Sequence, residues 1–171
     1  LAPLWKRNLR RTPLFTYGMV IAHLGCAVSL AGMAADSAFT VEKLVAAQPG
    51  ETIETAGWTL RFDGISTVAG DNWTALQADM RVARRGGDPV AIHPQARFFT
   101  SPPTNTTEAA LLTRWDGQLY VVLGQEAGAG RWQVRIWWKP FVTLIWLGGI
   151  MIALGGTLAL LGRERRGWML K

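Results

Sequence analysis

The chain has 171 residues, of which 49% are hydrophobic, and a net charge of +6, a size that suits one folded unit plus membrane segments. Residues 1–16 carry +4 and residues 162–171 carry +3, whereas residues 36–140 carry −1. The excess positive charge lies beside two apolar stretches, and this position indicates membrane topology. The charge therefore gives no support for nucleic-acid binding, and we expect no nucleic-acid partner. The single cysteine, Cys26, excludes an intrachain disulfide and a cysteine-based zinc site.

The N-terminal part predicts a basic cytoplasmic segment, residues 1–16, followed by a transmembrane helix over residues 17–35. Residues 17–35 contain no acidic or basic side chain apart from His23. Its nineteen residues span roughly 28 Å at about 1.5 Å each, close to the roughly 30 Å of a bilayer's hydrocarbon core. A soluble helix of this length would carry a polar stripe, and this one does not.

The helical wheel separates His23 from a stripe of small residues. At about 100° per residue the stripe falls within roughly 40° of one line, and it consists of Gly18, Ala22, Gly25, Ser29 and Gly32. Small residues let a second helix approach closely, and we expect that helix to present Gly149, Ala153 and Gly156. His23 points roughly 140° away from the stripe. Since an imidazole should not face lipid, we predict further helices on that side, from outside this chain.

Residues 36–140 predict an antiparallel β domain. Apolar residues alternate with period two in segments 51–63, 73–84, 90–99, 118–125 and 132–138. Gly-containing turns at 85–88 and 128–130 separate some of them, and residues 101–112 predict a Pro/Thr loop that ends in a short helical turn. Alternation favours strands with one buried face, as in a small barrel or sandwich.

Residues 141–161 predict the second transmembrane helix, because they contain no ionisable side chain, and residues 162–171 predict a basic cytoplasmic tail. By the positive-inside rule both termini are cytoplasmic and residues 36–140 lie on the opposite side. The fold class is therefore a membrane α+β fold, with two transmembrane helices flanking an antiparallel β-rich domain. The chain starts at Leu1, and its first helix lacks a small-residue cleavage site. We expect the C-terminal piece of a longer membrane protein, or one subunit of a split one.

His23 is the residue most suited to chemistry. An ionisable side chain inside a membrane helix marks a functional site by default, and imidazole is a good axial ligand for iron. A neutral imidazole that is hydrogen-bonded to a neighbouring helix is an equally good interpretation of the residues. The other histidine, His93, precedes Pro94 in a predicted strand, and we expect a structural role for it. The sequence contains no CxxCH, GxGxxG or P-loop motif, so catalysis by this chain alone is not predicted.

The order of several motifs resembles the C-terminal region of CcmF, the membrane haem lyase subunit of cytochrome c maturation. Residues 17–25, YGMVIAHLG, resemble its GMxxAHxG helix. The remaining matches follow in order along the chain: Pro49-Gly50, 58–62, 71–73, 94–99, 107–110, 119–124, 132–135, 139–141 and 145–148. The turn at 71–73 and residues 95 and 96 depart from the family pattern, which leaves any specific role of those loops open.

The resemblance implies that His23 is the transmembrane histidine that ligates haem b in this family. It also implies an inner-membrane location, with the domain of residues 36–140 in the periplasm. The haem would accept electrons from quinol and reduce incoming haem, which is then delivered to apocytochrome c. The implied partners are membrane lipid, the remaining helices of the same lyase, the haem chaperone, and apocytochrome c with its docking proteins. The family pattern places no histidine at His93, and we expect a solvated charge at Arg97 more than a haem-propionate contact.

Two other functions stay open at this stage. The chain could be a membrane-anchored periplasmic binding or scaffold module without a cofactor. It could also belong to a channel or transporter, since intramembrane ionisable residues also mark ion paths. The second alternative predicts further ionisable residues in the membrane segments, and those segments show only His23.

Overall fold

The computed structural model describes residues 12–168, and side chains up to residue 163. The predictions for residues 1–11 and 169–171 therefore lie outside the described part. The chain divides into two compact units. One is a helical pair, formed by the described residues of Leu1–Ala38 and Phe141–Lys171, and the other is a β domain, Phe39–Pro140.

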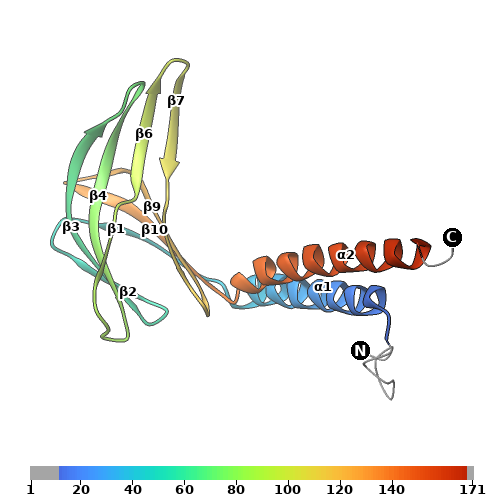
Figure 1. Ribbon diagram of the computed structural model, residues 1–171. Coiled ribbons are helices and arrows are strands. Elements are labelled where there is room, and N and C mark those ends of the chain that lie inside the picture. Colours follow the sequence, from blue (N-terminus) through green and yellow to red (C-terminus); the bar gives the residue numbers. More distant parts are fainter. Residues whose placement is uncertain (1–11, 169–171) are drawn as a thin grey trace. The chain divides into compact units, whose positions relative to one another are not determined.

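The helical pair consists of α1, Leu14–Phe39, and α2, Thr143–Trp168, which run side by side (Figure 1). Both helices are long and apolar enough to cross a membrane. Each one is longer than the span predicted from its sequence. In α1 the helix continues past Ala35, and in α2 it continues through the basic residues that we expected to form a tail.

Glycines allow the two helix backbones to approach closely. A Cβ atom added to Gly25 would lie 2.7 Å from the carbonyl oxygen of Gly148, and one added to Gly155 would lie 2.6 Å from that of Gly18. The hydroxyl of Ser29 donates a hydrogen bond of 3.2 Å to the carbonyl oxygen of Ile145. The predicted stripe on α1 is thus confirmed as the contact face.

The predicted partner face of α2 is wrong by one residue. Cβ atoms added to Gly149 and Gly156 would meet no other atom within 4 Å. Gly148 and Gly155 carry the contact instead, and a helix turns by about 100° per residue, so neighbouring positions face different directions. Spacing alone could not decide between two glycine rows that are offset by one position.

The β domain is an antiparallel sandwich of two sheets. One sheet has the order β1-β10-β9-β8, and the other has the order β2-β3-β4-β6-β7 with β5 beside β4. The strands are β1 Val41–Ala47, β2 Thr52–Thr55, β3 Trp58–Ala69, β4 Trp73–Arg84, β5 Val90–Ile92, β6 Gln95–Thr100, β7 Pro103–Glu108, β8 Ala110–Arg114, β9 Gly117–Gly128 and β10 Arg131–Pro140.

Two long hairpins form the frame of the sandwich. In the β3–β4 hairpin the register runs from Trp58 opposite Arg84 to Ala69 opposite Thr74, with a bulge next to Phe62. The β9–β10 hairpin closes through residues 128–130, all three of which have positive φ, as the glycines there predict. These hairpins confirm the alternation read from the sequence.

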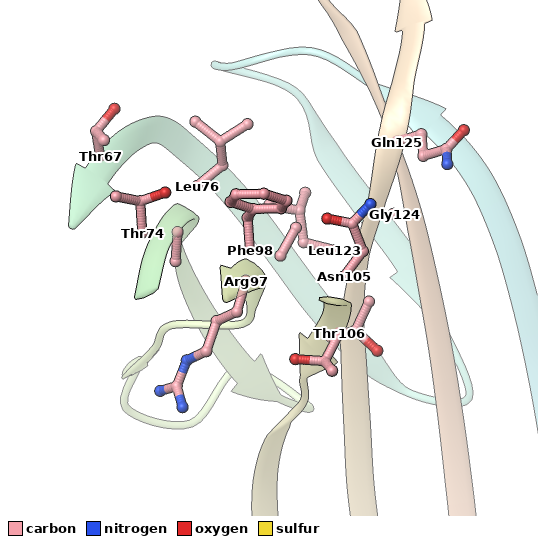
Figure 2. Close-up of a pocket in the computed structure, with 13 residues that line it drawn as sticks. Thr67, Thr74, Leu76, Arg97, Phe98, Asn105, Thr106, Leu123, Gly124 and Gln125 are labelled. Atoms are coloured by element: carbon pink, nitrogen blue, oxygen red, sulfur yellow. The ribbon is translucent and has the colours of Figure 1, made fainter. Parts of the chain in front are cut away.

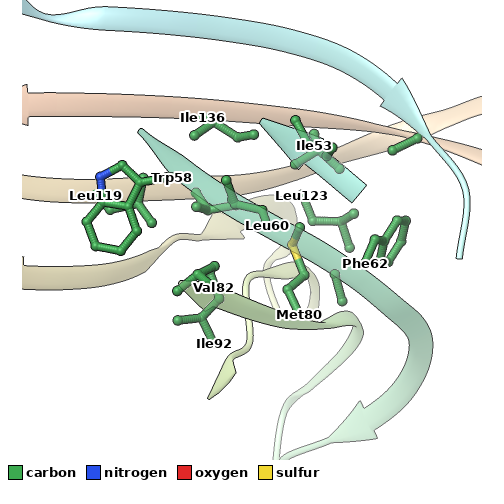
Figure 3. Packing of buried hydrophobic residues seen from close by; sticks show 14 of the residues in the cluster. Ile53, Trp58, Leu60, Phe62, Met80, Val82, Ile92, Leu119, Leu123 and Ile136 are labelled. Atoms are coloured by element: carbon green, nitrogen blue, oxygen red, sulfur yellow. The ribbon is translucent and has the colours of Figure 1, made fainter. Parts of the chain in front are cut away.

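The core lies between the two sheets, where the inward-facing residues of each strand meet (Figure 3). Successive side chains of a strand point to opposite faces, so the inward residues of β3 and β9 recur with period two. Completely buried members include Leu60, Phe62, Val82, Leu119, Leu123 and Ile136. This contiguous apolar cluster stabilises the sandwich through the burial of apolar surface.

Two local predictions are wrong, and one strand was missed. Residues 101–112, predicted as a loop and helical turn, form most of β7 and β8. The strand β1 was not predicted, although it pairs with β10 over its whole length. His93 lies in the connection between β5 and β6 and not within a strand. In β7 every residue is exposed, so the strand leaves no burial pattern in the sequence.

Candidate functional site

His23 lies on α1, on the side of the helix that faces away from α2. The residues that contact α2, such as Gly18 and Gly25, are buried, whereas His23 is exposed in the described structure. Its neighbours on the same side, Cys26, Ala27 and Leu30, are exposed as well. The orientation predicted from the helical wheel is therefore confirmed.

The imidazole of His23 has one nitrogen engaged and one available. Its Nδ1 lies 2.7 Å from the carbonyl oxygen of Met19, one turn earlier in α1. Because a carbonyl oxygen only accepts hydrogen bonds, Nδ1 carries the proton in this arrangement. The lone pair of the neutral ring then resides on Nε2. The ring is thus held in the tautomer that can bind a metal through Nε2.

A metal at His23 would receive a single ligand from this part of the chain. The side chains that the structure describes, up to residue 163, include no cluster of three or more His, Cys, Asp or Glu that could hold a metal ion. Zinc sites in proteins use three or four such ligands. A haem brings four nitrogens of its own and needs only axial ligands from protein. The single imidazole of His23 therefore fits the role of an axial ligand to a haem.

The second histidine belongs to a polar network on the β domain. His93 Nδ1 lies 2.9 Å from Oδ1 of Asp79, which also accepts a hydrogen bond of 2.9 Å from the amide of Gln77. The hydroxyl of Ser66 donates to the other carboxylate oxygen at 3.0 Å. The hydrogen bonds from Gln77, Ser66 and His93 hold the pKa of Asp79 below its usual value. This set of contacts is consistent with the structural role expected for His93.

Arg97 is partly exposed and is engaged by its neighbours. Its guanidinium lies 4.4 Å from the ring centre of Trp73 and forms an ion pair of 3.2 Å with Glu108. It also donates a hydrogen bond of 2.8 Å to the side-chain oxygen of Gln95. We expected a solvated charge on a strand, and the structure shows a partly exposed arginine on β6 whose partners are brought together by the register of β4, β6 and β7.

An ion pair in the β domain was not predicted from the sequence. Arg84 and Asp116 form an ion pair with both side chains less than a fifth exposed. The Arg84 guanidinium also lies 4.3 Å from the ring centre of Trp138 and 5.5 Å from that of Trp58. Asp116 precedes β9 and Arg84 ends β4, so this cluster joins the two sheets. The distance between the two residues in sequence left no local signal for it.

Known proteins are similar to this chain in both sequence and fold. The family model described as CcmF C-terminal beta-sandwich matches residues 38–140. The chain belongs to the CcmF family. The cytochrome c-type biogenesis protein CcmF of Pseudomonas aeruginosa is 37% identical over 88% of this chain, and the protein of that name from Escherichia coli is 36% identical over 88%. The cytochrome c-type biogenesis protein CycK of Rhizobium meliloti is 35% identical over 95%.

The fold comparison agrees with this membership. A solved structure named cytochrome c heme lyase CcmF matches 84% of this chain with a TM-score of 0.70 at 21% identity. The matched region covers 23% to 24% of the length of these relatives and of that structure. This chain thus corresponds to about a quarter of a CcmF protein.

Proposed function

We propose that this chain is the C-terminal region of a cytochrome c haem lyase of the bacterial inner membrane, in which His23 supplies one axial ligand to haem b. The observation that carries the proposal is the hydrogen bond from His23 Nδ1 to the Met19 carbonyl, which leaves Nε2 without a partner among the described residues, on a side of α1 that they leave exposed. Membership of the CcmF family supports it independently.

The chemistry of the ring suits this role. A neutral imidazole loses no proton when Nε2 binds iron, so binding at neutral pH is favoured. The hydrogen bond at Nδ1 fixes the ring orientation and raises the basicity of Nε2, as partners of metal-binding histidines generally do. A haem b held there would supply a one-electron Fe(III)/Fe(II) couple. The second axial ligand would come from outside this chain.

The side of α1 that carries His23 needs a cover in the membrane. Leu30 and Met33 are exposed on α1, and Cys26 and Ala27 lie beside the imidazole. The remaining three quarters of a CcmF-length protein provide enough chain for the helices that would pack there. Apolar side chains around the ring would exclude water, and the protein environment of a haem influences its reduction potential.

The topology follows from the charges that flank the helices. We propose that residues 17–35 and 141–161 cross the membrane, with the basic segments 1–16 and 162–171 in the cytoplasm. The β domain then lies in the periplasm, where a haem chaperone and apocytochrome c with its docking proteins can reach it. In this arrangement the β domain takes part in delivering haem to apocytochrome c.

The visible absorption spectrum of the purified full-length protein tests the role of His23. We expect the wild-type protein to show a reduced b-type spectrum and His23→Ala to lose most of the bound haem. His93→Ala is the matched control, because it removes the other histidine of this chain, and we expect it to retain wild-type haem content.

Wild-type haem content in His23→Ala would overturn the ligand assignment. If the wild-type protein itself bound no haem, the chain would be a membrane-anchored module without a cofactor. The two results are distinguishable, because loss of the ligand assignment is read from the His23→Ala variant and absence of a cofactor is read from the wild-type protein.

A further inference from the structure

The β domain has an open groove between its two sheets, beyond the end of the core (Figure 2). It encloses about 550 Å³ and is lined by residues of β3, β4, β6 and β7 from one sheet and β9 from the other. Leu123, at its inner end, is completely buried, whereas Phe98 is 45% and Leu76 is 36% exposed. The groove therefore continues the apolar interior of the sandwich outward to the surface.

Two strand edges border this groove. β7 is the last strand of its sheet and pairs only with β6 in the described structure. β8 pairs with β9 only as far as Val121, although β9 continues to Gly128. Beyond Val121 no strand within residues 12–168 pairs with that edge of β9. Edge strands present backbone N–H and C=O groups that can pair with a further strand.

The side chains at the groove are suited to an uncharged guest. Its rim carries neutral polar groups, among them Asn105, Thr106 and Gln125. Arg97 lines it as well, but its guanidinium is engaged by Glu108 and Trp73, and Figure 2 shows the side chain turned away from Phe98. Leu76 and Phe98 form an apolar floor. An extended chain placed there could direct alternate side chains onto this floor.

We propose that this groove binds an extended segment of apocytochrome c around its haem-attachment sequence, as an added β-strand. The inference rests on the proposed function, which makes apocytochrome c the substrate. A cytochrome that has not yet received its haem lacks the group around which its core is built, so its backbone is available for pairing. The fixed residues of a CxxCH sequence carry no charge when the histidine is neutral, which matches the groove. Strand addition uses main-chain hydrogen bonds for affinity and side-chain pockets for selectivity.

Fluorescence anisotropy of a labelled peptide tests the binding to the full chain in detergent micelles. The probe is a twelve-residue synthetic peptide with one CxxCH sequence in which both cysteines are replaced by alanine, so that no disulfide forms with Cys26. We expect saturable binding to the wild-type chain and an affinity at least about tenfold lower for Phe98→Ser, because the floor loses its aromatic side chain. Leu111→Ser is the matched control, since Leu111 is 53% exposed and does not line the groove. It should bind like the wild type.

A second variant covers the case in which Phe98→Ser disturbs the fold. Asn105 is exposed on β7, so Asn105→Trp can fill the groove without entering the core. We expect it to weaken binding at least about tenfold with unchanged far-ultraviolet circular dichroism. Equal binding by the wild type and Asn105→Trp would overturn the proposal, and so would a lack of binding by the wild type.

The backbone contribution is tested with the same peptide N-methylated at alternate residues. This change removes the N–H groups along one edge of the peptide and keeps all side chains. We expect at least a tenfold loss of affinity, whereas equal binding of the methylated peptide would contradict strand addition. His23→Ala should bind the unmodified peptide normally. If the wild-type chain does not bind the peptide while His23→Ala loses its haem, this inference is wrong and the proposed function is still supported.

Discussion

Asp63 occupies the bulge of β3 and lies between two arginines. Arg81 donates two hydrogen bonds to its carboxylate at 2.6 and 2.7 Å, and Arg61 donates one at 3.0 Å. The hydrogen bonds from Arg81, followed by those from Arg61 and the charges of both arginines, lower the pKa of Asp63 to about 2. A carboxyl group with a lowered pKa in the folded protein links stability to pH.

We predict that Asp63 stabilises the β domain above about pH 4 and that this contribution is lost as the pH falls through about 2. The ordinary pKa of 3.8 sets the upper end of the window and the folded value sets the lower end. In Asp63→Asn the contribution is absent at every pH. Denaturant unfolding followed by tryptophan fluorescence should show the wild type more stable at pH 6 and the difference shrinking toward pH 2. A difference that stays constant over this range would contradict the assignment.

His23 shows what the sequence can and cannot predict at a single residue. Its depth follows from its position within an apolar segment, and its direction away from the glycine stripe follows from the helical period. Which ring nitrogen carries the proton cannot be predicted from the sequence, because the tautomer depends on how the side chain reaches the Met19 carbonyl. The contacts of Arg97 and the pair of Arg84 with Asp116 were missed for a related reason. Trp73 and Glu108 reach Arg97 through the pairing of β6 with β4 and β7. Asp116 lies in the turn between β8 and β9 and meets Arg84 across the two sheets.

At the scale of the elements, the two helices contact each other along one row of glycines on α2. Gly155 faces α1, and a side chain there would meet backbone atoms of Gly18 and Ala22. Gly156, the next residue, faces open space in the described structure. Backbone atoms cannot move aside as flexible side chains do, so a large residue at Gly155 must push the helices apart.

Gly155→Leu should therefore destabilise the helical pair by more than about 1 kcal/mol, because overpacking of a tight contact typically costs 1–3 kcal/mol. Gly156→Leu, the matched control in the adjacent position, should leave its stability nearly unchanged. Thermal unfolding of the detergent-solubilised chain, followed by circular dichroism at 222 nm, compares the two. If both variants unfold at the same temperature, the contact face of α2 is assigned incorrectly.

Strands were predictable from the sequence where one face is buried. In β4, β9 and β10 buried residues alternate with more accessible ones along much of the strand, so the hydrophobic pattern predicts them. β7 is exposed at every position, and it is held by its pairing with β6. A strand held only by backbone pairing leaves no hydrophobic pattern, even though β6 directly precedes β7 in the chain. The groove beside β7 was invisible to sequence reasoning for the same reason.

At the scale of the whole molecule, the chain combines a helical pair with a β domain that has its own core. The excess positive charge lies entirely outside the region between the two predicted spans. Positive charges beside membrane helices stay preferentially on the cytoplasmic side, so this distribution predicts that the β domain is translocated as a unit.

Cysteine labelling in whole cells checks this topology. The native Cys26 is replaced by alanine, and one new cysteine is introduced at a time, as Asp88→Cys in an exposed turn of the β domain or as Lys171→Cys at the C-terminus. A membrane-impermeant maleimide, applied in a buffer that opens the outer membrane and leaves the inner membrane intact, should label Asp88→Cys. Lys171→Cys should react only after the inner membrane is permeabilised. The reverse pattern would contradict the proposed orientation.

The most direct measurement of the central claim is the haem spectrum of His23→Gly in the full-length protein, recorded with and without added imidazole. If Nε2 of His23 binds the iron, the glycine variant loses the reduced b-type spectrum, and free imidazole restores it by occupying the position of the missing side chain. A His23→Gly protein that keeps the wild-type spectrum without imidazole would show that another residue holds the iron.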